Sequence, residues 1–252
     1  MTSFLLFTLH APLASWGEIA VGEWRGSWDR PSRSAVLGLL GAALGLLRAD
    51  VAALAALTDG YGVGVRNDAV GDTMQDYHTT QSVSRVDLRR SGARTRAEMM
   101  AVADKQTILS RREYREDVVF TVAMWQSGCA RWQLDDLADA LRYPVFALYA
   151  GRRSNPLGLP VHPVVVEASS LASALESRLP LPDNVPAEFR RLRPRHGWGR
   201  EVAHDSCVGF ESGLVEPFRR HIRRDSPVNR LGWLFEERVM HVGMMPVPET
   251  SP

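Results

Sequence analysis

The chain has 252 residues, of which 45% are hydrophobic and 23% charged, and its 30 Lys and Arg residues against 29 Asp and Glu give a formal net charge of +1. This composition is that of a globular protein and excludes a disordered or fibrous chain. The longest charge-free apolar run, residues 34–47, is too short to span a bilayer. The N-terminus lacks the basic start of a secretory signal, so we expect a cytoplasmic protein without membrane association.

Arginine supplies almost all of the positive charge, since Lys105 is the one lysine. A GC-rich genome explains such a ratio, so the placement of the charges is more informative than their type. They gather in three clusters: nine basic against four acidic residues between residues 85 and 115, then residues 190–200 and residues 219–224. Basic runs are usually solvated surfaces, and one cluster alone is only a weak indication of phosphate binding.

The first third of the chain predicts a strand, two helices and a second strand. The apolar run Phe4–His10 is typical of a buried strand, and a turn-rich segment with Pro12 and Gly17 follows it. Residues 34–47 predict a buried helix capped by Ser32 or Ser34, and residues 51–57 predict a second helix. A strand at Tyr61–Val65 completes a β-α-β unit.

The remainder of the chain repeats this pattern. The segment Arg115–Trp125 is the strongest strand signal, because it is rich in Val, Phe and Thr. The further predicted elements are a helix at Leu134–Leu141, short strands at Val145–Tyr149 and Val161–Glu167, a small helix at Ser169–Leu179 and a last strand at Glu237–Met244. Two such units predict an α+β fold, a ferredoxin-like or RRM-like sheet with helices on one face, interrupted by a basic excursion at residues 76–110.

The motif content argues against metal or nucleotide catalysis. The chain has no phosphate-binding loop, no dinucleotide fingerprint and no HExxH, GxSxG or CxxC motif. Cys129 and Cys207 alone can form neither a disulfide framework nor a zinc site, so we expect reduced thiols. We therefore expect no metal and no cofactor.

A metal-free ribonuclease would need only a general base and a general acid. The candidates are His10, His78 beside Tyr77, and Tyr114. His10 ends a core strand, which favours a structural role, whereas His78 lies in polar, basic sequence. No two of the histidines lie close together in the sequence at a catalytic spacing.

Two polar motifs favour the binding of phosphates. Arg152 and Arg153, with Ser154 and Asn155, lie in a loop bounded by Gly and Pro, although a solvated turn has the same composition. Residues 30–34 put two arginines at the start of a helix, where an anion is favoured, although a simple capping turn also fits. Aromatic residues such as Trp16, Tyr77 and Tyr114 could stack on RNA bases, but isolated aromatic residues are more often part of a core.

Six motifs in this order resemble the CasD family of subunits of the type I-E CRISPR Cascade complex, within the repeat-associated RRM-like superfamily. They are LxxPLxSWG (the Leu9–Gly17 region), RPSRSAVLGLLGAALG (30–45), DYHT (76–79), TILSRREYREDVVFTVAMW (107–125), YAGRRSNPLG (149–158) and RRDSPVN (223–229). The resemblance spans nearly the whole chain. It implies an RRM-like palm in residues 1–75 and 111–245, with an irregular loop at 180–200, an inserted thumb at residues 76–110 and a tail at 246–252.

The resemblance further implies a non-catalytic subunit that caps the 5′ handle of the CRISPR RNA. It would join the CasC backbone to the large CasA subunit, and it would meet target DNA only through the guide, with its thumb beside one guide position. By motif match, the residues expected to contact the handle are Arg30, Arg33, Tyr77, His78, Arg111, Arg112, Arg152, Arg153 and Asn155.

Two alternatives remain open. The type I-C relatives cleave precursor RNA with a tyrosine near the start of the first helix and a Lys-His pair. Here Pro31, Ser32 and Arg33 occupy that helix start and Lys105 is the one lysine, so the resemblance implies that the cleavage set is absent. A metal-independent endoribonuclease that matures precursor CRISPR RNA is nevertheless the first alternative, and a free-standing RRM-like RNA binder is the second.

Overall fold

The computed structural model describes residues 1–17, 20, 22–102, 105–181, 199–229, 232 and 234–247. The helices are α1 (Arg33–Ala43), α2 (Val51–Gly60), α3 (Arg85–Ser91), α4 (Arg96–Ala101), α5 (Leu134–Arg142) and α6 (Leu171–Glu176). The strands are β1 (Thr2–Ala14), β2 (Trp16–Gly17), β3 (Trp24–Arg25), β4 (Ser27–Trp28), β5 (Tyr61–Ala69), β6 (Asp72–Ser82), β7 (Gln106–Gln126), β8 (Val164–Ala168), β9 (Glu201–His204), β10 (Val215–Asn229) and β11 (Leu234–Met244).

One large sheet organises the molecule. Its strand order is β10-β11-β9-β5-β7-β1-β8, and β3 and β6 pair along the outer part of β7. The central strands β5, β7, β1 and β8 pair antiparallel. In chain order they form the series β1-α1-β5-β7-α5-β8, which is the βαββαβ arrangement of a ferredoxin-like fold. The predicted α+β, RRM-like fold class is confirmed.

Apolar residues cover both faces of this sheet, because β1 is an almost continuous apolar strand. Leu5, Phe7 and Leu9 pack with the buried residues of α1, α2 and α5. The alternate residues Phe4 and Leu6 pack with Trp125 and α6 on the opposite face. The expectation that all helices lie on one face was therefore wrong. The second apolar face needs a cover, and α6 supplies it.

The first helix is placed by its cap. Ser32 accepts a hydrogen bond from the backbone N–H of Ala35, as a helix-capping serine should. The helix ends at Ala43, earlier than the composition suggests, and Gly45 follows with a left-handed φ of 74°.

The predicted strand at Val145–Tyr149 was wrong. The backbone N–H groups of Val145 and Phe146 donate to the carbonyls of Ala43 and Ala42, which lie in the last turn of α1. Tyr149 makes only an isolated bridge to Pro156. The segment finds its hydrogen bonds at a helix end, which a strand propensity cannot reveal.

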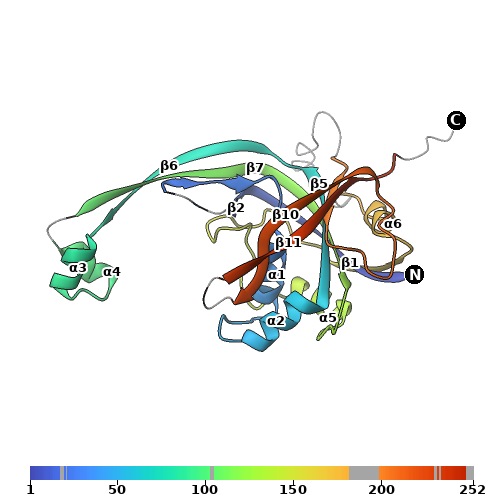
Figure 1. Cartoon of the computed structure of the whole chain (residues 1–252), viewed down its shortest axis with the longest axis horizontal. Coiled ribbons are helices and arrows are strands. Elements are labelled where there is room, and N and C mark those ends of the chain that lie inside the picture. The colour runs from blue at the N-terminus through green and yellow to red at the C-terminus, as the bar shows by residue number, and fades with distance from the viewer. Residues whose placement is uncertain are drawn as a thin grey trace.

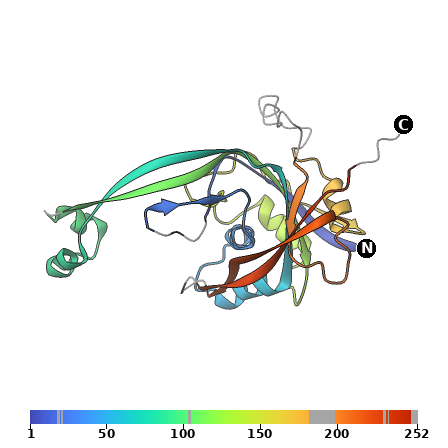
Figure 2. The same cartoon turned by 45° about the horizontal axis from the view of Figure 1, so that its top comes forward.

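A long arm leaves the body of the molecule (Figures 1 and 2). We define the arm as residues 72–116, in which β6 pairs antiparallel with the first half of β7, from Asp72 opposite Glu116 to Ser82 opposite Gln106. Helices α3 and α4 lie at its end and contain no buried residue. Where the arm meets the body, Gly71 and Asp117 have left-handed φ angles of 67° and 52°. The basic excursion expected at residues 76–110 lies within this arm.

The remaining expectations concern the cysteines, membrane spans and the segments near the C-terminus. Cys129 and Cys207 are free thiols. None of the helices that the structure describes is long and apolar enough to cross a membrane. Residues 182–198, most of the loop expected at 180–200 and all of its basic cluster except Arg200, and residues 248–252 of the expected tail lie outside the described residues.

Candidate nucleic-acid interface

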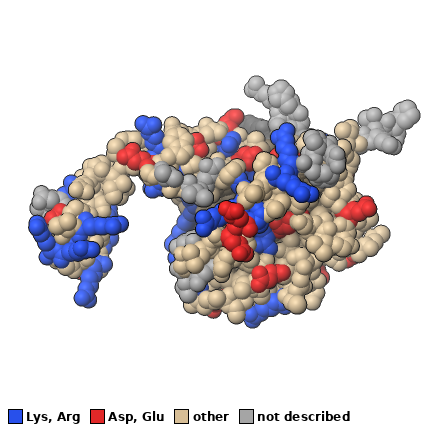
Figure 3. Space-filling model, in the orientation of Figure 1, with Lys and Arg blue, Asp and Glu red and all other residues tan. Residues whose placement is uncertain are grey.

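Arginines gather in two regions of the molecule. Figure 3 shows Lys and Arg side chains grouped at the far end of the arm and again on the body. The group at the end of the arm consists of exposed residues on and beside α3 and α4: Arg85, Arg89, Arg90, Arg94 and Arg96. Such a group attracts polyanions, but nothing in its geometry selects one ligand.

The second region surrounds a cavity of about 400 Å³, which we call the arginine cavity. It lies where the loop before α1 meets β7, β9 and the β10–β11 hairpin. Its polar and aromatic lining residues are Ser27, Trp28, Asp29, Arg30, Arg115, Glu201, Arg219, His221 and Arg223. Four arginines thus face two carboxylates, an excess of positive charge that suits a phosphate group. The fold brings together basic residues from distant parts of the chain.

Two guanidinium nitrogen atoms in the arginine cavity have no hydrogen-bond partner among the described residues. Arg30 is bonded to Asp29 at 2.9 and 2.8 Å and to Glu201. Burial opposes the charge of Arg30, but these two carboxylates outweigh burial and raise its pKa. The buried Nη1 of Arg30 and Nε of Arg115 have no hydrogen-bond partner among the described residues. Both are donors for which an anion would be a partner.

A stacked pair forms one wall of the arginine cavity. The guanidinium of Arg223 lies 3.1 Å from the ring centroid of Trp28, whose side chain is partly exposed. Burial lowers the pKa of Arg223, and the charges of Arg238 and Arg30 act in the same direction. An anion bound here would therefore stabilise a positive charge that the protein itself stabilises poorly.

Arg33, the second arginine of the helix-start motif, fastens α1 to the body. Its Nε donates to Asp205 at 2.8 Å, and its Nη2 donates to the carbonyl oxygens of Thr58 and Tyr61. Its backbone N–H donates to Asp225 at 3.0 Å. Arg33 thus positions the helix start beside β10, whereas the neighbouring Arg30 lines the arginine cavity.

The predicted residues of DYHT and of the 107–125 motif meet midway along the strands of the arm. Tyr77 is in register with Arg111, and His78 with Ser110. Nε2 of His78 lies 2.6 Å from a carboxylate oxygen of Asp76. Arg112 donates to Ser110 at 3.3 Å, whereas the exposed side chain of Arg111 makes no hydrogen bond or ion pair among the described residues.

The loop at residues 151–155 lies on the other face of β7. The guanidinium of Arg152 stacks 4.5 Å from the ring centroid of Tyr114, and alternation along a strand points Tyr114 away from the face of Arg111 and Arg115. Asn155 is 1% exposed, and its backbone and side chain close the loop onto Ala150. Of the three predicted contact residues Arg152, Arg153 and Asn155, only Arg153 is exposed, and it lies beside a cavity of about 690 Å³ against α1.

The acid and base candidates do not assemble. His10 is 2% exposed, and burial lowers its pKa. Tyr114 is 6% exposed beneath Arg152. Of these candidates, Tyr77 and His78 are accessible to solvent. The described residues contain no group of three or more His, Cys, Asp or Glu side chains that could hold a metal ion.

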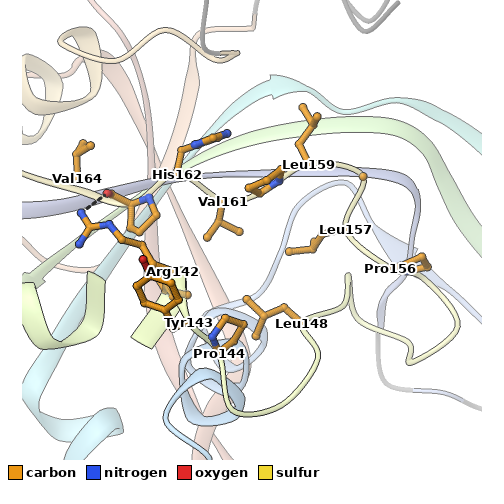
Figure 4. A pocket seen from close by; sticks show the side chains of 14 residues that line it. Arg142, Tyr143, Pro144, Leu148, Pro156, Leu157, Leu159, Val161, His162 and Val164 are labelled. Atoms are coloured by element: carbon orange, nitrogen blue, oxygen red, sulfur yellow. Dashed lines mark hydrogen bonds between the residues drawn. The ribbon is translucent and has the colours of Figure 1, made fainter. Parts of the chain in front are cut away.

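A further cavity, of about 660 Å³, is lined mainly by apolar side chains such as Leu148, Leu157 and Val161 between α5 and β8 (Figure 4). Its one arginine, Arg142, donates from Nη2 to the carbonyl of Pro163 at 2.9 Å. With its arginine engaged, this cavity lacks the charge that a phosphate requires, and it lies outside the candidate interface.

Comparison with known proteins places the chain in a family. The family described as "CRISPR-associated protein (Cas_Cas5)" matches residues 4–246. The chain belongs to the Cas5 family of CRISPR-associated proteins. It is 32% identical over 196 residues to "CRISPR system Cascade subunit CasD" of Escherichia coli (strain K12), a match that covers 75% of this chain and 82% of that protein. The resemblance to CasD predicted from the sequence motifs is thereby confirmed.

Two solved structures resemble this Cas5 chain. A chain of a "CRISPR RNA-guided surveillance complex" is 25% identical, with a TM-score of 0.63, over 98% of this chain and 92% of that one. A "Crystal structure of Cas protein" is 24% identical, with a TM-score of 0.55, over 99% of this chain and 100% of that one. The second likeness shows the fold alone.

Sequence analysis missed three parts of this Cas5 interface. Trp28 lies in a turn-rich segment whose pairing the sequence does not reveal. Arg219 and Arg223 were recognised as a basic cluster, but only the register of β10 with β11 turns them toward Arg30. A Trp followed at a distance by an Arg-rich strand is too common a pattern to have identified them.

Proposed function

We propose that this Cas5 chain is a non-catalytic, RNA-binding subunit of the CRISPR surveillance complex that holds the 5′ handle of the CRISPR RNA. The named relatives, a Cascade subunit and a chain of an RNA-guided complex, support membership of such a complex. The observation that carries the RNA-binding part is the arginine cavity, where four arginines and an exposed tryptophan surround a space that suits a phosphate and an adjoining base.

The remaining parts of the proposal follow from the family resemblance. The subunit joins the CasC backbone to the large CasA subunit in the cytoplasm. The arm acts as the thumb beside one guide position, and target DNA is reached through the guide. The arm extends well beyond the body (Figure 2), as a segment that inserts between other components must.

Arg219→Ala tests the RNA-binding part. Arg219 is exposed and lines the arginine cavity, so we expect the variant to fold normally and to bind repeat-derived RNA more weakly. The dependence of log affinity on log salt concentration should flatten by about 0.7 for one lost phosphate contact. Arg131→Ala is the charge-matched control, since Arg131 is exposed and lies over Trp132, outside the interface.

An equal salt slope in Arg219→Ala and in the wild type would contradict the proposal.

The nearness of His78 to Asp76 also calls for a test of the endoribonuclease alternative. Purified protein incubated with repeat RNA in EDTA should leave the RNA intact. Specific cleavage that is lost in His78→Ala would replace the binding-only function with catalysis.

A further inference from the structure

Midway along its strands, the arm carries three side chains in register on neighbouring strands, which we call the aromatic row. Trp24 on β3 is paired with Arg111 on β7, and Arg111 is paired with Tyr77 on β6. Residues in register on adjacent strands project from the same face of a sheet. Two strand spacings of about 4.8 Å separate the backbones of Trp24 and Tyr77, with Arg111 between them.

All three side chains of the aromatic row are available to a ligand. Trp24 is 44% exposed and Tyr77 is 56% exposed. Among the described residues, none of the three side chains makes a hydrogen bond, an ion pair or a ring contact. By contrast, Trp16 and Trp125 are buried and pack edge-on against phenylalanines. The aromatic row is therefore not an extension of the core.

The aromatic row continues the arginine cavity along one strand. Alternation puts Arg111, Glu113 and Arg115 on the same face of β7, and Arg115 lines the cavity. Four residues of strand separate Arg111 from Arg115, about 13 Å. The intervening carboxylate of Glu113 is engaged by the backbone N–H of Ser27 at 3.2 Å. Along this face of β7, the guanidinium of Arg111 therefore has no bonded partner among the described residues, and the carboxylate of Glu113 is already hydrogen-bonded.

We propose that the aromatic row stacks on an unpaired base of the RNA strand whose phosphates occupy the arginine cavity. Trp24 and Tyr77 supply the π-faces, and Arg111 contacts the phosphate beside that base. A base must be unpaired to expose its face for stacking, so the ligand is single-stranded. A positively charged strand between two aromatic residues suits a nucleotide better than it suits an apolar peptide. This inference rests on the proposed RNA-binding function.

The test is a double-mutant cycle between protein and RNA. The probes are a fluorescently labelled single-stranded oligoadenylate and an abasic RNA of the same length, each titrated with the full chain. Because stacking on an aromatic side chain is a strong contact, Trp24→Ala should weaken binding of the intact RNA roughly five- to hundredfold. It should leave binding of the abasic RNA nearly unchanged. Trp24→Phe should restore most of the loss.

Tyr143→Ala is the matched control, because Tyr143 is 82% exposed and lies on the apolar cavity, away from the aromatic row. Circular dichroism establishes that each variant is folded. Equal losses for intact and abasic RNA, or no loss in Trp24→Ala, would overturn the stacking role. If Arg219→Ala still weakens RNA binding in that case, the proposed function survives. A wild-type chain that binds neither of these two RNAs overturns the stacking role, and the proposed function is overturned only if the chain also fails to bind repeat-derived RNA.

Discussion

Asp68 illustrates how a single buried residue ties the sheet to its cover. Its carboxylate accepts from Nε of Arg66 and from Oγ1 of Thr121, both at 2.6 Å, and Arg66 also donates to the carbonyl of Leu175 in α6. Burial raises the pKa of Asp68 to about 6, while Arg66 and Thr121 oppose that rise. At neutral pH the pair is ionised, and each charge depends on the other.

Asp68→Ala should therefore cost about 3–5 kcal/mol of unfolding free energy, because it leaves the buried Arg66 charge uncompensated. Denaturant unfolding at pH 7.5 measures the loss. Asp139→Ala is the control, since its ion pair with Arg142 lies at the surface and is worth less than about 1 kcal/mol. Similar losses in the two variants would show that the pair inside the sheet is not a special contact.

Sequence analysis could not find this pair. Arg66 and Asp68 are separated by one residue, a spacing that puts them on the same face of any strand, but a charged strand end usually faces solvent. Only the burial of that face under α6 makes the pair important. Trp24 was missed for a different reason, because Arg111 and Tyr77, the residues aligned with it on β7 and β6, are remote in sequence.

At the level of secondary structure, the sequence predicted the two β-α-β units and missed the true length of β7. That strand was predicted to begin at Arg115 but begins at Gln106. Its first half lies in the arm, where both faces are largely solvated and no apolar alternation is required. Apolar patterning detects strands that cover a core, so the arm escaped it, whereas β1 and the second half of β7 did not.

Because α3 and α4 contain no buried residue, the end of the arm should be dispensable for folding. Replacing residues 83–105 with an Asn-Gly turn joins Ser82 to Gln106, which already face each other in register. We expect the midpoint of thermal unfolding to stay within about 2 °C of the wild type, a shift that corresponds to less than about 1 kcal/mol. A decrease several times larger would mean that the helices at the end of the arm support the body.

For the whole molecule, the net charge of +1 is the sum of two kinds of arginine, those in internal ion pairs and those at the surface that the described residues leave without an acidic partner. Arg33, Arg66 and Arg238 are paired with carboxylates inside the fold. By contrast, the side chains of Arg111 and Arg153 make no hydrogen bond or ion pair among the described residues. The carboxylates of Asp205, Asp68 and Asp225 neutralise these internal arginines locally. A neutral total is therefore compatible with a local RNA-binding surface, which needs positive charge on one side only.

The stability of the whole fold should depend on pH through its buried histidines. Nδ1 of His204 lies 2.7 Å from the carbonyl of Asp205, and the ring stacks on His241. Burial lowers the pKa of His204 below 6.5, and burial lowers that of His10 as well. The unfolded chain therefore takes up protons that the folded chain excludes, so stability falls as the pH drops below about 6.5.

We expect His204→Gln to flatten this decline, by no more than about 1.4 kcal/mol per pH unit, the slope of one proton. Urea unfolding between pH 7.5 and 6 measures it. Below about pH 6 the raised pKa of Asp68 acts in the opposite direction, because the folded chain then binds the extra proton. His162→Asn is the control, since Asn tolerates the left-handed backbone at that position. Equal slopes of unfolding free energy against pH in the wild type and in both variants would show that His204 does not cause the decline.

The left-handed residues at the base of the arm set the direction in which the arm leaves the body. Gly71 and Asp117 lie where the two strands of the arm leave the body, and a side chain at Gly71 would collide with the carbonyl oxygen of Glu116. Beyond this point the arm continues for about 36 Å, eleven residues of strand. A rotation of about 5° at this pair would therefore displace the tip by about 3 Å, similar to the rise of one residue along a strand. The position of the tip thus depends on the backbone conformation of Gly71 and Asp117.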